Sequence, residues 1–247
     1  MLDASKNLHP SINNCMRALG LSQCSHISHS VFRAYHPLYG ELVAKFALST
    51  RAKFQLRSEA HFLQHHQSPY WPQFFDSNSH QHVDWLMMSL VEGKSLEQQE
   101  DRFNVRQIKQ LETGLHAIHC TGFIHGDIKP ANIVIKPDGS AVFVDFGSVL
   151  PISKHYFEQP YSSVTPRFAS FNALVRNDRV RAYDDFASLA IVVHTLMYSH
   201  PFSGLSVAEF SQTNKKTKIA QIPAKYQLIL TQELERANHF HSRLNTD

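Results

Sequence analysis

The sequence predicts an α+β protein, in which a strand-rich first part precedes a larger and mostly helical second part. Apolar and polar side chains alternate over residues 42–48, which is the period of a strand with one buried face. Residues 105–121 instead carry apolar side chains at helical spacing. Strands and helices that are segregated along a chain are typical of α+β proteins. A chain of 247 residues has room for one large domain or two small ones.

The first part is expected to hold most of the strands. Two or three strands fall within residues 23–45, and Val43 and Lys45 share one face of the last of them. The opposite face carries the alternating apolar side chains Leu42, Ala44, Phe46 and Leu48. The elements expected next are a helix over 51–66 and strands over 74–75 and 84–91.

The second part is expected to contain the long helices and one long irregular segment. Its expected elements are a helix over 105–121, a hairpin of 133–135 with 141–144, an irregular stretch over 148–170 and a helix over 183–197. An irregular stretch of this length in a compact domain indicates a functional loop. We expect the domain boundaries to give a lead-in over residues 1–18, a β-rich lobe over 19–92 and a shortened helical lobe over 93–247.

Composition argues against several classes of partner. The formal net charge is only +3 and no block of Lys and Arg occurs, so neither nucleic acid nor a membrane surface is an expected partner. The longest mostly apolar run, residues 186–193, is far shorter than the roughly 20 residues that span a bilayer. Three cysteines at unrelated spacings favour a reducing compartment. We therefore expect a soluble cytoplasmic protein.

The most informative stretch is His-Gly-Asp-Ile-Lys-Pro-Ala-Asn, residues 125–132, which is followed by Val-Asp-Phe-Gly-Ser at 144–148. Phosphoryl transfer needs a carboxylate near the acceptor hydroxyl, a cation on the moving phosphoryl group and oxygen ligands for Mg²⁺. Asp127 fits the catalytic base and Lys129 fits the cation beside the γ-phosphate. Asn132 and Asp145 fit the magnesium ligands.

With these motifs the chain resembles the protein kinase family, and specifically its eukaryotic-like serine/threonine branch, in which a Lys stands two residues after the catalytic Asp. The resemblance extends from about residue 19 to residue 203. It implies a bilobal fold, with a small β-rich N-lobe bearing one helix and a larger helical C-lobe around one cleft. It also implies transfer of the γ-phosphate of ATP to a Ser or Thr hydroxyl of a protein, with Mg²⁺ or Mn²⁺ as the metal.

The resemblance assigns further residues to nucleotide binding and to support. Lys45 matches the strand Lys that holds the α- and β-phosphates, and Glu59 matches its ion-pair partner on the first long helix. The other nucleotide-contacting positions that the resemblance implies are Val31, Val43, Ser89, Val91 and Val134. His125, Thr165 and Asp185 match positions that support the catalytic loop. Taken alone, Lys45 and Glu59 also fit an exposed strand end and a helix surface.

Histidine pairs at helical spacing raise the question of a metal site. They are His61 with His65 and His116 with His119. No cysteine or second carboxylate completes either pair, and no zinc signature fits. We therefore expect these histidines to be surface or packing residues.

The sequence departs from the family pattern at three places. The slots of the glycine-rich loop hold Cys24, His26 and His29, which makes close approach of the backbone to phosphates harder. Gly126 replaces the Arg that docks a phosphorylated loop in many kinases, so the chain is of the non-RD type. The Ala-Pro-Glu that ends the activation segment is replaced by residues 170–172, Ser-Phe-Asn, as in casein-kinase-like enzymes, so the usual buried Glu–Arg pair is absent.

Two other functions stay open at this point. The His-Gly-Asp sequence also occurs in small-molecule kinases of the aminoglycoside and choline phosphotransferase type, although Lys129, Pro130 and the Asp-Phe-Gly form count against them. The glycine-free loop favours a pseudokinase, which binds without turnover, although the complete set of Lys45, Asp127, Asn132 and Asp145 opposes it.

Overall fold

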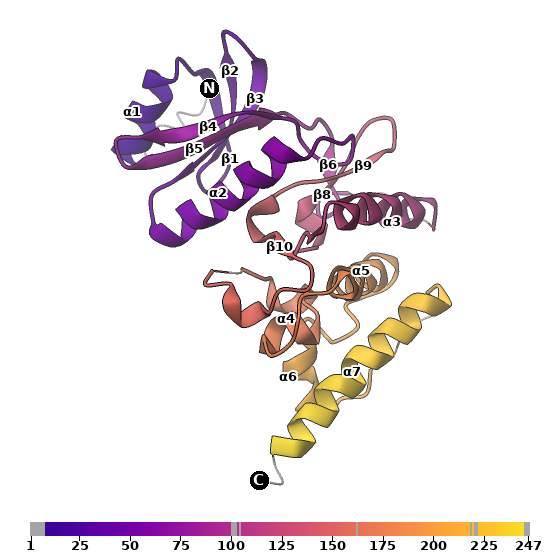
Figure 1. Cartoon of the computed structure of the whole chain (residues 1–247). Helices are drawn as coiled ribbons and strands as arrows, with labels where there is room; N and C mark the ends of the chain where they lie inside the picture. Colours follow the sequence, from indigo (N-terminus) through magenta and orange to yellow (C-terminus); the bar gives the residue numbers. More distant parts are fainter. Residues whose placement is uncertain are drawn as a thin grey trace. The chain divides into compact units, whose positions relative to one another are not determined.

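The computed structural model describes residues 8–99, 103, 105–161, 163–217, 219 and 222–244. The chain forms two compact units, residues 1–92 and 93–247, which are described separately (Figure 1). The first unit is built around one five-stranded antiparallel sheet and the second contains most of the helices. This segregation of strands and helices confirms the predicted α+β class.

The N-terminal unit follows the expected order of elements. They are α1 (Pro10–Ala18), β1 (Ser22–Ser28), β2 (Val31–His36), β3 (Gly40–Ala47), α2 (Thr50–His65), β4 (Phe74–His80) and β5 (Val83–Ser89). The sheet has the order β1-β2-β3-β5-β4, so β3 lies at its centre. Helix α2 begins after Ser49, whose hydroxyl accepts a hydrogen bond from the Ala52 amide at 3.3 Å.

Strand β3 alternates as predicted up to its end. Leu42, Ala44 and Phe46 are buried in the core of the unit, while Lys45 on the other face is partly exposed. Leu48 was expected to continue the buried row but is 36% exposed, because β3 ends at residue 47.

Helix α1 packs into the same core through its buried side chains Ile12, Cys15 and Met16. Burial raises the pKa of Cys15 to about 11, so this thiol stays protonated.

Helix α2 is tied to strand β5 by a buried carboxylate. Asp84 is 3% exposed, and its oxygens accept from Arg57 Nε and from the Ser79 hydroxyl, both at 2.6 Å. Lys53 approaches the same group at 3.9 Å. Burial alone would raise the pKa of Asp84, but the hydrogen bonds and charges of these neighbours hold it below its usual value. Asp84 therefore helps to fix the helix that carries Glu59.

The C-terminal unit has short strands and longer helices. Its regular elements are β6 (Lys94–Ser95), α3 (Val105–Cys120), β7 (Phe123–Ile124), β8 (Ile133–Ile135), β9 (Ala141–Phe143), β10 (Leu150–Pro151), α4 (Phe171–Val175), α5 (Ala182–Met197), α6 (Val207–Ser211) and α7 (Ala224–Leu244). Strands β6, β8 and β9 form one small sheet, and β7 pairs with β10. The stretch predicted to be irregular thus contains one short strand and two short 3-10 turns.

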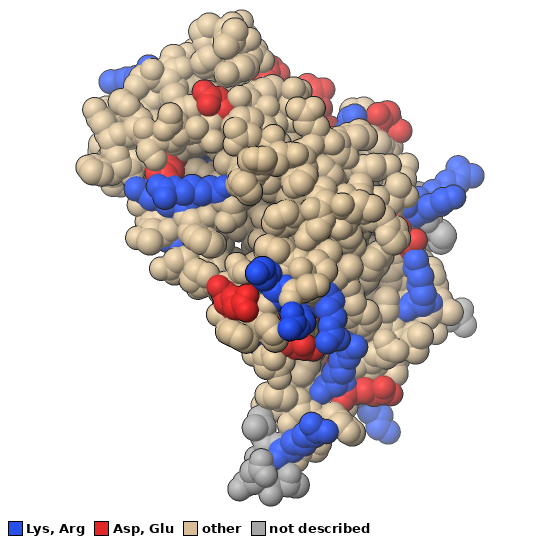
Figure 2. Space-filling view, in the orientation of Figure 1, with Lys and Arg blue, Asp and Glu red and all other residues tan. Residues whose placement is uncertain are grey.

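Helix α5 forms the centre of the C-terminal unit, because every residue from 187 to 194 is buried. Helix α7 packs against α5, and its Tyr226 hydroxyl donates to Glu112 on α3 at 2.5 Å. Charged side chains of both signs are spread over the face seen in Figure 2, in keeping with the small formal net charge of +3. Within the described residues, no helix combines the length and the apolar character that crossing a membrane requires.

We predict that Asp84→Ala destabilises the N-terminal unit by about 1–3 kcal/mol, because Ser79 and Arg57 lose a buried partner. Both tryptophans, Trp71 and Trp85, belong to this unit, so urea unfolding followed by tryptophan fluorescence reports on it selectively. Because the folded pKa of Asp84 is lowered, its stabilising effect is complete above the unfolded pKa of about 4 and is lost as the pH falls through the folded value.

The exposed Asp76 on β4 provides the matched control. Asp76→Ala should change the unfolding free energy by less than about 0.5 kcal/mol. Equal losses for the two variants, or a loss at Asp84 that does not depend on pH, would contradict the role given to this carboxylate.

Candidate functional site

Lys45 and Glu59 form a buried ion pair inside the N-terminal unit. The Lys45 ammonium contacts both carboxylate oxygens of Glu59 at 2.8 Å, and the two side chains are 14% and 2% exposed. Strand β3 supplies the Lys and helix α2 supplies the Glu. The pair therefore holds a partly exposed ammonium group in a fixed place on the sheet face opposite the core.

The other N-terminal positions lie on or near that face. Val31 pairs with Lys45 across β2 and β3, and Val43 is likewise half-buried. Strand β5 ends at Ser89, two residues before the predicted end, so Val91 lies in the loop that follows. The Ser89 amide donates to the Gln73 carbonyl at 2.8 Å and its hydroxyl accepts from the Gln73 amide at 2.9 Å. These two bonds end the strand at this residue.

The glycine-free loop is an exposed hairpin formed by β1 and β2. His29 at its turn has a φ of +40°, in the left-handed region that glycine favours. The ring of His26 contacts the His29 carbonyl oxygen at 2.8 Å and packs against Phe32 with the ring centroids 5.3 Å apart. Side-chain contacts, rather than glycine, therefore close this turn.

In the C-terminal unit, Asp127, Lys129 and Thr165 form one polar cluster. The Lys129 ammonium contacts Asp127 Oδ2 at 2.7 Å and Thr165 Oγ1 at 3.0 Å. The Thr165 amide donates to Asp127 Oδ1 at 2.8 Å. Residues separated by 38 positions along the chain are thus brought together around one carboxylate. The cluster places a carboxylate, an ammonium and a hydroxyl within reach of a common ligand.

Asn132 and Asp145 are placed beside this cluster by the backbone. The Asn132 side-chain nitrogen donates to the Asp127 backbone carbonyl at 2.9 Å, and the Asn132 backbone carbonyl accepts from the Val144 amide at 2.9 Å. Val144 O in turn contacts His125 Nε2 at 3.1 Å. Asp145 follows directly with a φ of +68°, a strained conformation for a residue other than glycine, and such strain often occurs at functional sites.

Asp185 on α5 fixes the backbone just before Asp127. Its carboxylate is 1% exposed and accepts from the amides of His125 at 2.8 Å and Gly126 at 3.0 Å. The ring of His119 contacts the same carboxylate at 2.9 Å. His119 was expected to be a packing or surface residue, and its ring does pack against Phe186 with the centroids 5.5 Å apart; its contact with Asp185 is an addition that sequence analysis did not make. The available sequence signal was its position six residues before His125.

Gly126 lies in close contact with Ser148, at the start of the stretch 148–170. Its φ is +82°, and a Cβ atom there would overlap the backbone carbonyl of Ser148. The Ser148 hydroxyl donates to the Ser163 carbonyl at 2.6 Å. No arginine side chain fits at residue 126 in this arrangement. The segment is instead held by a hydrogen bond between two of its own residues.

The structure brings the predicted residues together as two sets, each inside its own unit. Val31, Val43, Lys45, Glu59, Ser89 and Val91 belong to the N-terminal unit, whereas His125, Asp127, Lys129, Asn132, Val134, Asp145, Thr165 and Asp185 belong to the C-terminal unit. Val134 lies on β8 and pairs with Ser95 and Val142. Sequence analysis missed Ser148, whose role depends on its tertiary neighbours.

A comparison with protein families gives a match to the protein kinase domain over residues 28–245. Among individual proteins, the chain is 26% identical over 239 residues to citron rho-interacting kinase of Rattus norvegicus. This match covers 88% of this chain and 12% of that protein. It is 28% identical over 167 residues to the serine/threonine-protein kinase PknH of Mycobacterium bovis, covering 65% of this chain and 28% of the relative.

A third relative is the serine/threonine-protein kinase PknL of Mycobacterium tuberculosis, which is 25% identical over 179 residues and matches 68% of this chain. The match covers 42% of PknL. The chain thus spans less than half the length of each of these three relatives.

We predict that Gly126→Ala destabilises the C-terminal unit by more than the roughly 1–3 kcal/mol of backbone strain alone, because the new methyl group overlaps the Ser148 carbonyl. Gly139 is a matched control, since it has the same φ of +82° and no neighbouring atom within 4 Å of a Cβ. Thermal unfolding followed by circular dichroism compares the two variants. Equal losses at the two positions would contradict the close contact at Gly126.

Proposed function

This chain belongs to the protein kinase domain family, and from that premise we propose that it is an ATP-dependent serine/threonine protein kinase. The observation that carries the proposal is the cluster in which Lys129 contacts both Asp127 and Thr165. Thr165 belongs to the stretch 165–170, which resembles a segment of protein kinases. A small-molecule kinase needs no such contact between this stretch and the loop that carries Asp127 and Lys129. The proposed acceptor is a Ser or Thr hydroxyl of a protein.

Asp127 is the proposed catalytic base, because its carboxylate is only 11% exposed and is oriented by Lys129 and the Thr165 amide. In this role it orients the acceptor hydroxyl and accepts its proton as the oxygen attacks. Lys129 neutralises negative charge on the phosphoryl group in transit. Its contact with Thr165 keeps the ammonium in place when the activation segment is ordered.

The donor set at Asn132 and Asp145 fits a divalent cation. Asn132 donates through its side-chain nitrogen to the Asp127 carbonyl, which turns its side-chain oxygen away from that bond. An amide oxygen and a carboxylate are ligands that Mg²⁺ prefers, and Mn²⁺ accepts them too. The cation supplies charge neutralisation for the phosphates of ATP.

In the N-terminal unit, we assign Lys45 to the α- and β-phosphates and Glu59 to the orientation of its ammonium group. We assign Val31 and Val43 to apolar contacts with the adenine. Ser89 and Val91 supply backbone groups for its polar edge. The free thiols of Cys15, Cys24 and Cys120 favour a reducing compartment such as the cytoplasm.

The proposal is tested by incubating the protein with labelled Mg·ATP in three arms: alone, with a generic protein substrate and with an aminoglycoside. We expect label on Ser or Thr of a protein. Label on the aminoglycoside would instead indicate a small-molecule kinase. Nucleotide binding without labelling in any arm would indicate a pseudokinase, for which the glycine-free hairpin is the supporting feature.

We predict that Asp145→Ala abolishes labelling, because it removes the main proposed ligand of the cation. The fall in kcat should be at least about a hundredfold, in line with the loss of a principal charge-stabilising group. Asp138→Asn is the control, since Asp138 lies in the exposed β8–β9 turn and its side chain is 63% exposed. A mutant at Asp145 that retains wild-type turnover would refute the assignment.

We also predict that phosphatase treatment leaves the activity unchanged. Gly126 offers no cation for a phosphate, and the Ser148–Ser163 bond holds the segment without one. The test is to measure activity before and after treatment, with mass spectrometry to verify removal of phosphate. Loss of activity on dephosphorylation would mean that a phosphate orders the segment after all.

We further predict that Ser148→Ala lowers kcat, because it removes the hydrogen bond to the Ser163 carbonyl.

A further inference from the structure

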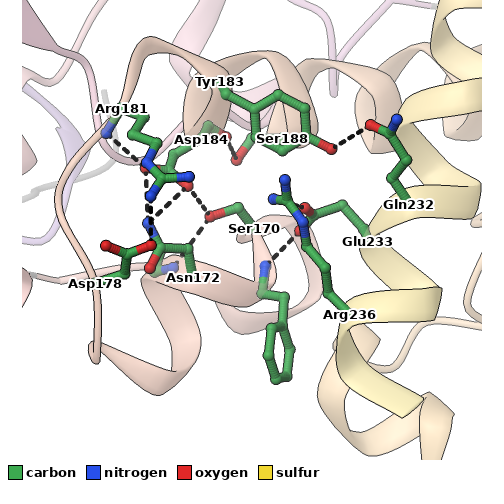
Figure 3. A network of polar contacts seen from close by, with 12 residues as sticks. Ser170, Asn172, Asp178, Arg181, Tyr183, Asp184, Ser188, Gln232, Glu233 and Arg236 are labelled. Carbon is green, nitrogen blue, oxygen red and sulfur yellow. Dashed lines mark hydrogen bonds and ion pairs between the residues drawn. The ribbon is translucent and has the colours of Figure 1, made fainter. Parts of the chain in front are cut away.

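The end of the activation segment lacks the acidic residue of the family pattern, because Asn172 occupies that position. Its side-chain nitrogen donates to the Arg179 carbonyl at 2.9 Å and lies 3.2 Å from Asp184 Oδ2. Ser170 is the N-cap that precedes helix α4, and its hydroxyl donates to Asp184 Oδ1 at 2.9 Å. Figure 3 shows these residues gathered around Asp184. Asn172 therefore belongs to a polar cluster with α5 and makes no ion pair of its own.

A buried acid approaches the same helix from a distant part of the chain. Glu233 on α7 is 0% exposed, and its Oε2 accepts from the Phe171 amide at 2.5 Å. Phe171 is the first residue of α4, so its amide has no partner within that helix. The two residues are 62 positions apart in sequence. Figure 3 shows the Glu233 side chain extending from the yellow helix α7.

Glu233 is surrounded by groups that stabilise it in this place. Arg236, one turn later on α7, contacts Oε1 at 3.2 Å, and its guanidinium lies 4.6 Å from the centre of the Tyr183 ring. Phe240 packs edge-on against Phe171 with the ring centroids 5.4 Å apart. Burial raises the pKa of Glu233, so its charge depends on the Phe171 amide and Arg236. Helix α7 thus contacts the start of α4 through polar and aromatic groups together.

The start of α4 is connected to the catalytic cluster by a short, ordered stretch. Thr165, which binds both Asp127 and Lys129, is six residues before Phe171. Between them the Phe168 amide donates to the Thr165 carbonyl at 2.9 Å, and the Ala169 amide donates to the Pro166 carbonyl at 3.2 Å. A displacement of Phe171 is therefore passed along a tight turn to Thr165 rather than absorbed by a loose loop.

We propose that Glu233 is a positioning residue that replaces, from helix α7, the acid missing at residue 172, and that it fixes the activation segment so that Thr165 stays on Asp127 and Lys129. In the family pattern the acid belongs to the segment and pairs with a buried arginine. Here the acid is on helix α7, and the segment offers a backbone amide. The inference rests on the proposed function for its catalytic consequence, but not for the anchor itself.

The anchor is tested by hydrogen exchange followed by mass spectrometry on the full chain, without nucleotide. Glu233→Ala removes both contacts, whereas Glu233→Gln keeps an oxygen for the Phe171 amide and loses the ion pair with Arg236. We expect exchange over residues 163–175 to be slowest in the wild type, faster in Glu233→Gln and fastest in Glu233→Ala. Exchange in residues 8–92 should be unchanged. The control is Glu235→Ala, because Glu235 is an exposed acid on the same helix.

The catalytic consequence is tested by steady-state kinetics below the unfolding temperature of each variant. Glu233→Ala should lower kcat about tenfold to a hundredfold, as expected for misplacement by a remote residue. The KM for ATP should stay within about twofold of wild type, since uniform nucleotide binding is not altered. Glu233→Gln should fall between wild type and Ala. Glu235→Ala should match wild type.

The outcomes separate this inference from the proposed function. Unchanged exchange over residues 163–175 in Glu233→Ala would overturn the anchor, whatever the activity. Faster exchange with a wild-type kcat would overturn the positioning role. An inactive wild-type protein would overturn the proposed function, and the positioning role with it, while the exchange experiment still decides the anchor. Equal effects of Glu235→Ala and Glu233→Ala would also count against the proposal.

Discussion

The proposed catalytic loop, residues 125–132, depends on one buried carboxylate. Asp185 accepts hydrogen bonds from two successive backbone amides, at His125 and Gly126, and from the ring of His119. A carboxylate removed from water costs several kcal/mol unless such donors surround it. The same bonds that satisfy Asp185 immobilise the backbone directly before Asp127. Since α5 is buried along its central turns, the loop inherits the rigidity of the core of the C-terminal unit.

Beyond this loop, a series of close contacts and hydrogen bonds holds the stretch from Ser148 to Thr165, which we propose is part of the activation segment. Gly126 leaves room for the Ser148 carbonyl, Ser148 binds Ser163, and Thr165 binds Asp127. Hydrogen bonds between neutral groups are weak one by one, about 0.5–1.5 kcal/mol each, but the bond of the Thr165 amide to an ionised group is stronger. We propose that together they take the place of an arginine and a phosphate here. Glycine at residue 126 is thus part of the arrangement, because the contact excludes any side chain.

The sequence predicted the placement of residues best where they are contiguous in the chain. The stretch from His125 to Asn132 carries its spacing in the chain, and the alternation in β3 or the period of α5 reports burial directly. It failed where a contact depends on tertiary folding. Glu233 follows no motif and stands 62 residues from Phe171, and His119 looks like any helix histidine until α5 packs beside it. Strand ends were also misplaced, because Ser89 and Ala47 end their strands through bonds and turns that periodicity does not encode.

The hairpin of β1 and β2 shows how a kinase-like chain can close this turn without glycine. His29 adopts a positive φ, which costs of order 1–3 kcal/mol for a residue with a side chain. The contact from His26 to the His29 carbonyl and the packing of that ring on Phe32 offset part of this cost. The side chains of His26 and His29, however, occupy space beside the backbone that glycine would leave open. Tight phosphate contacts by this backbone are therefore harder to form, and the proposed burden of holding the phosphates shifts to Lys45, whose place is fixed by Glu59.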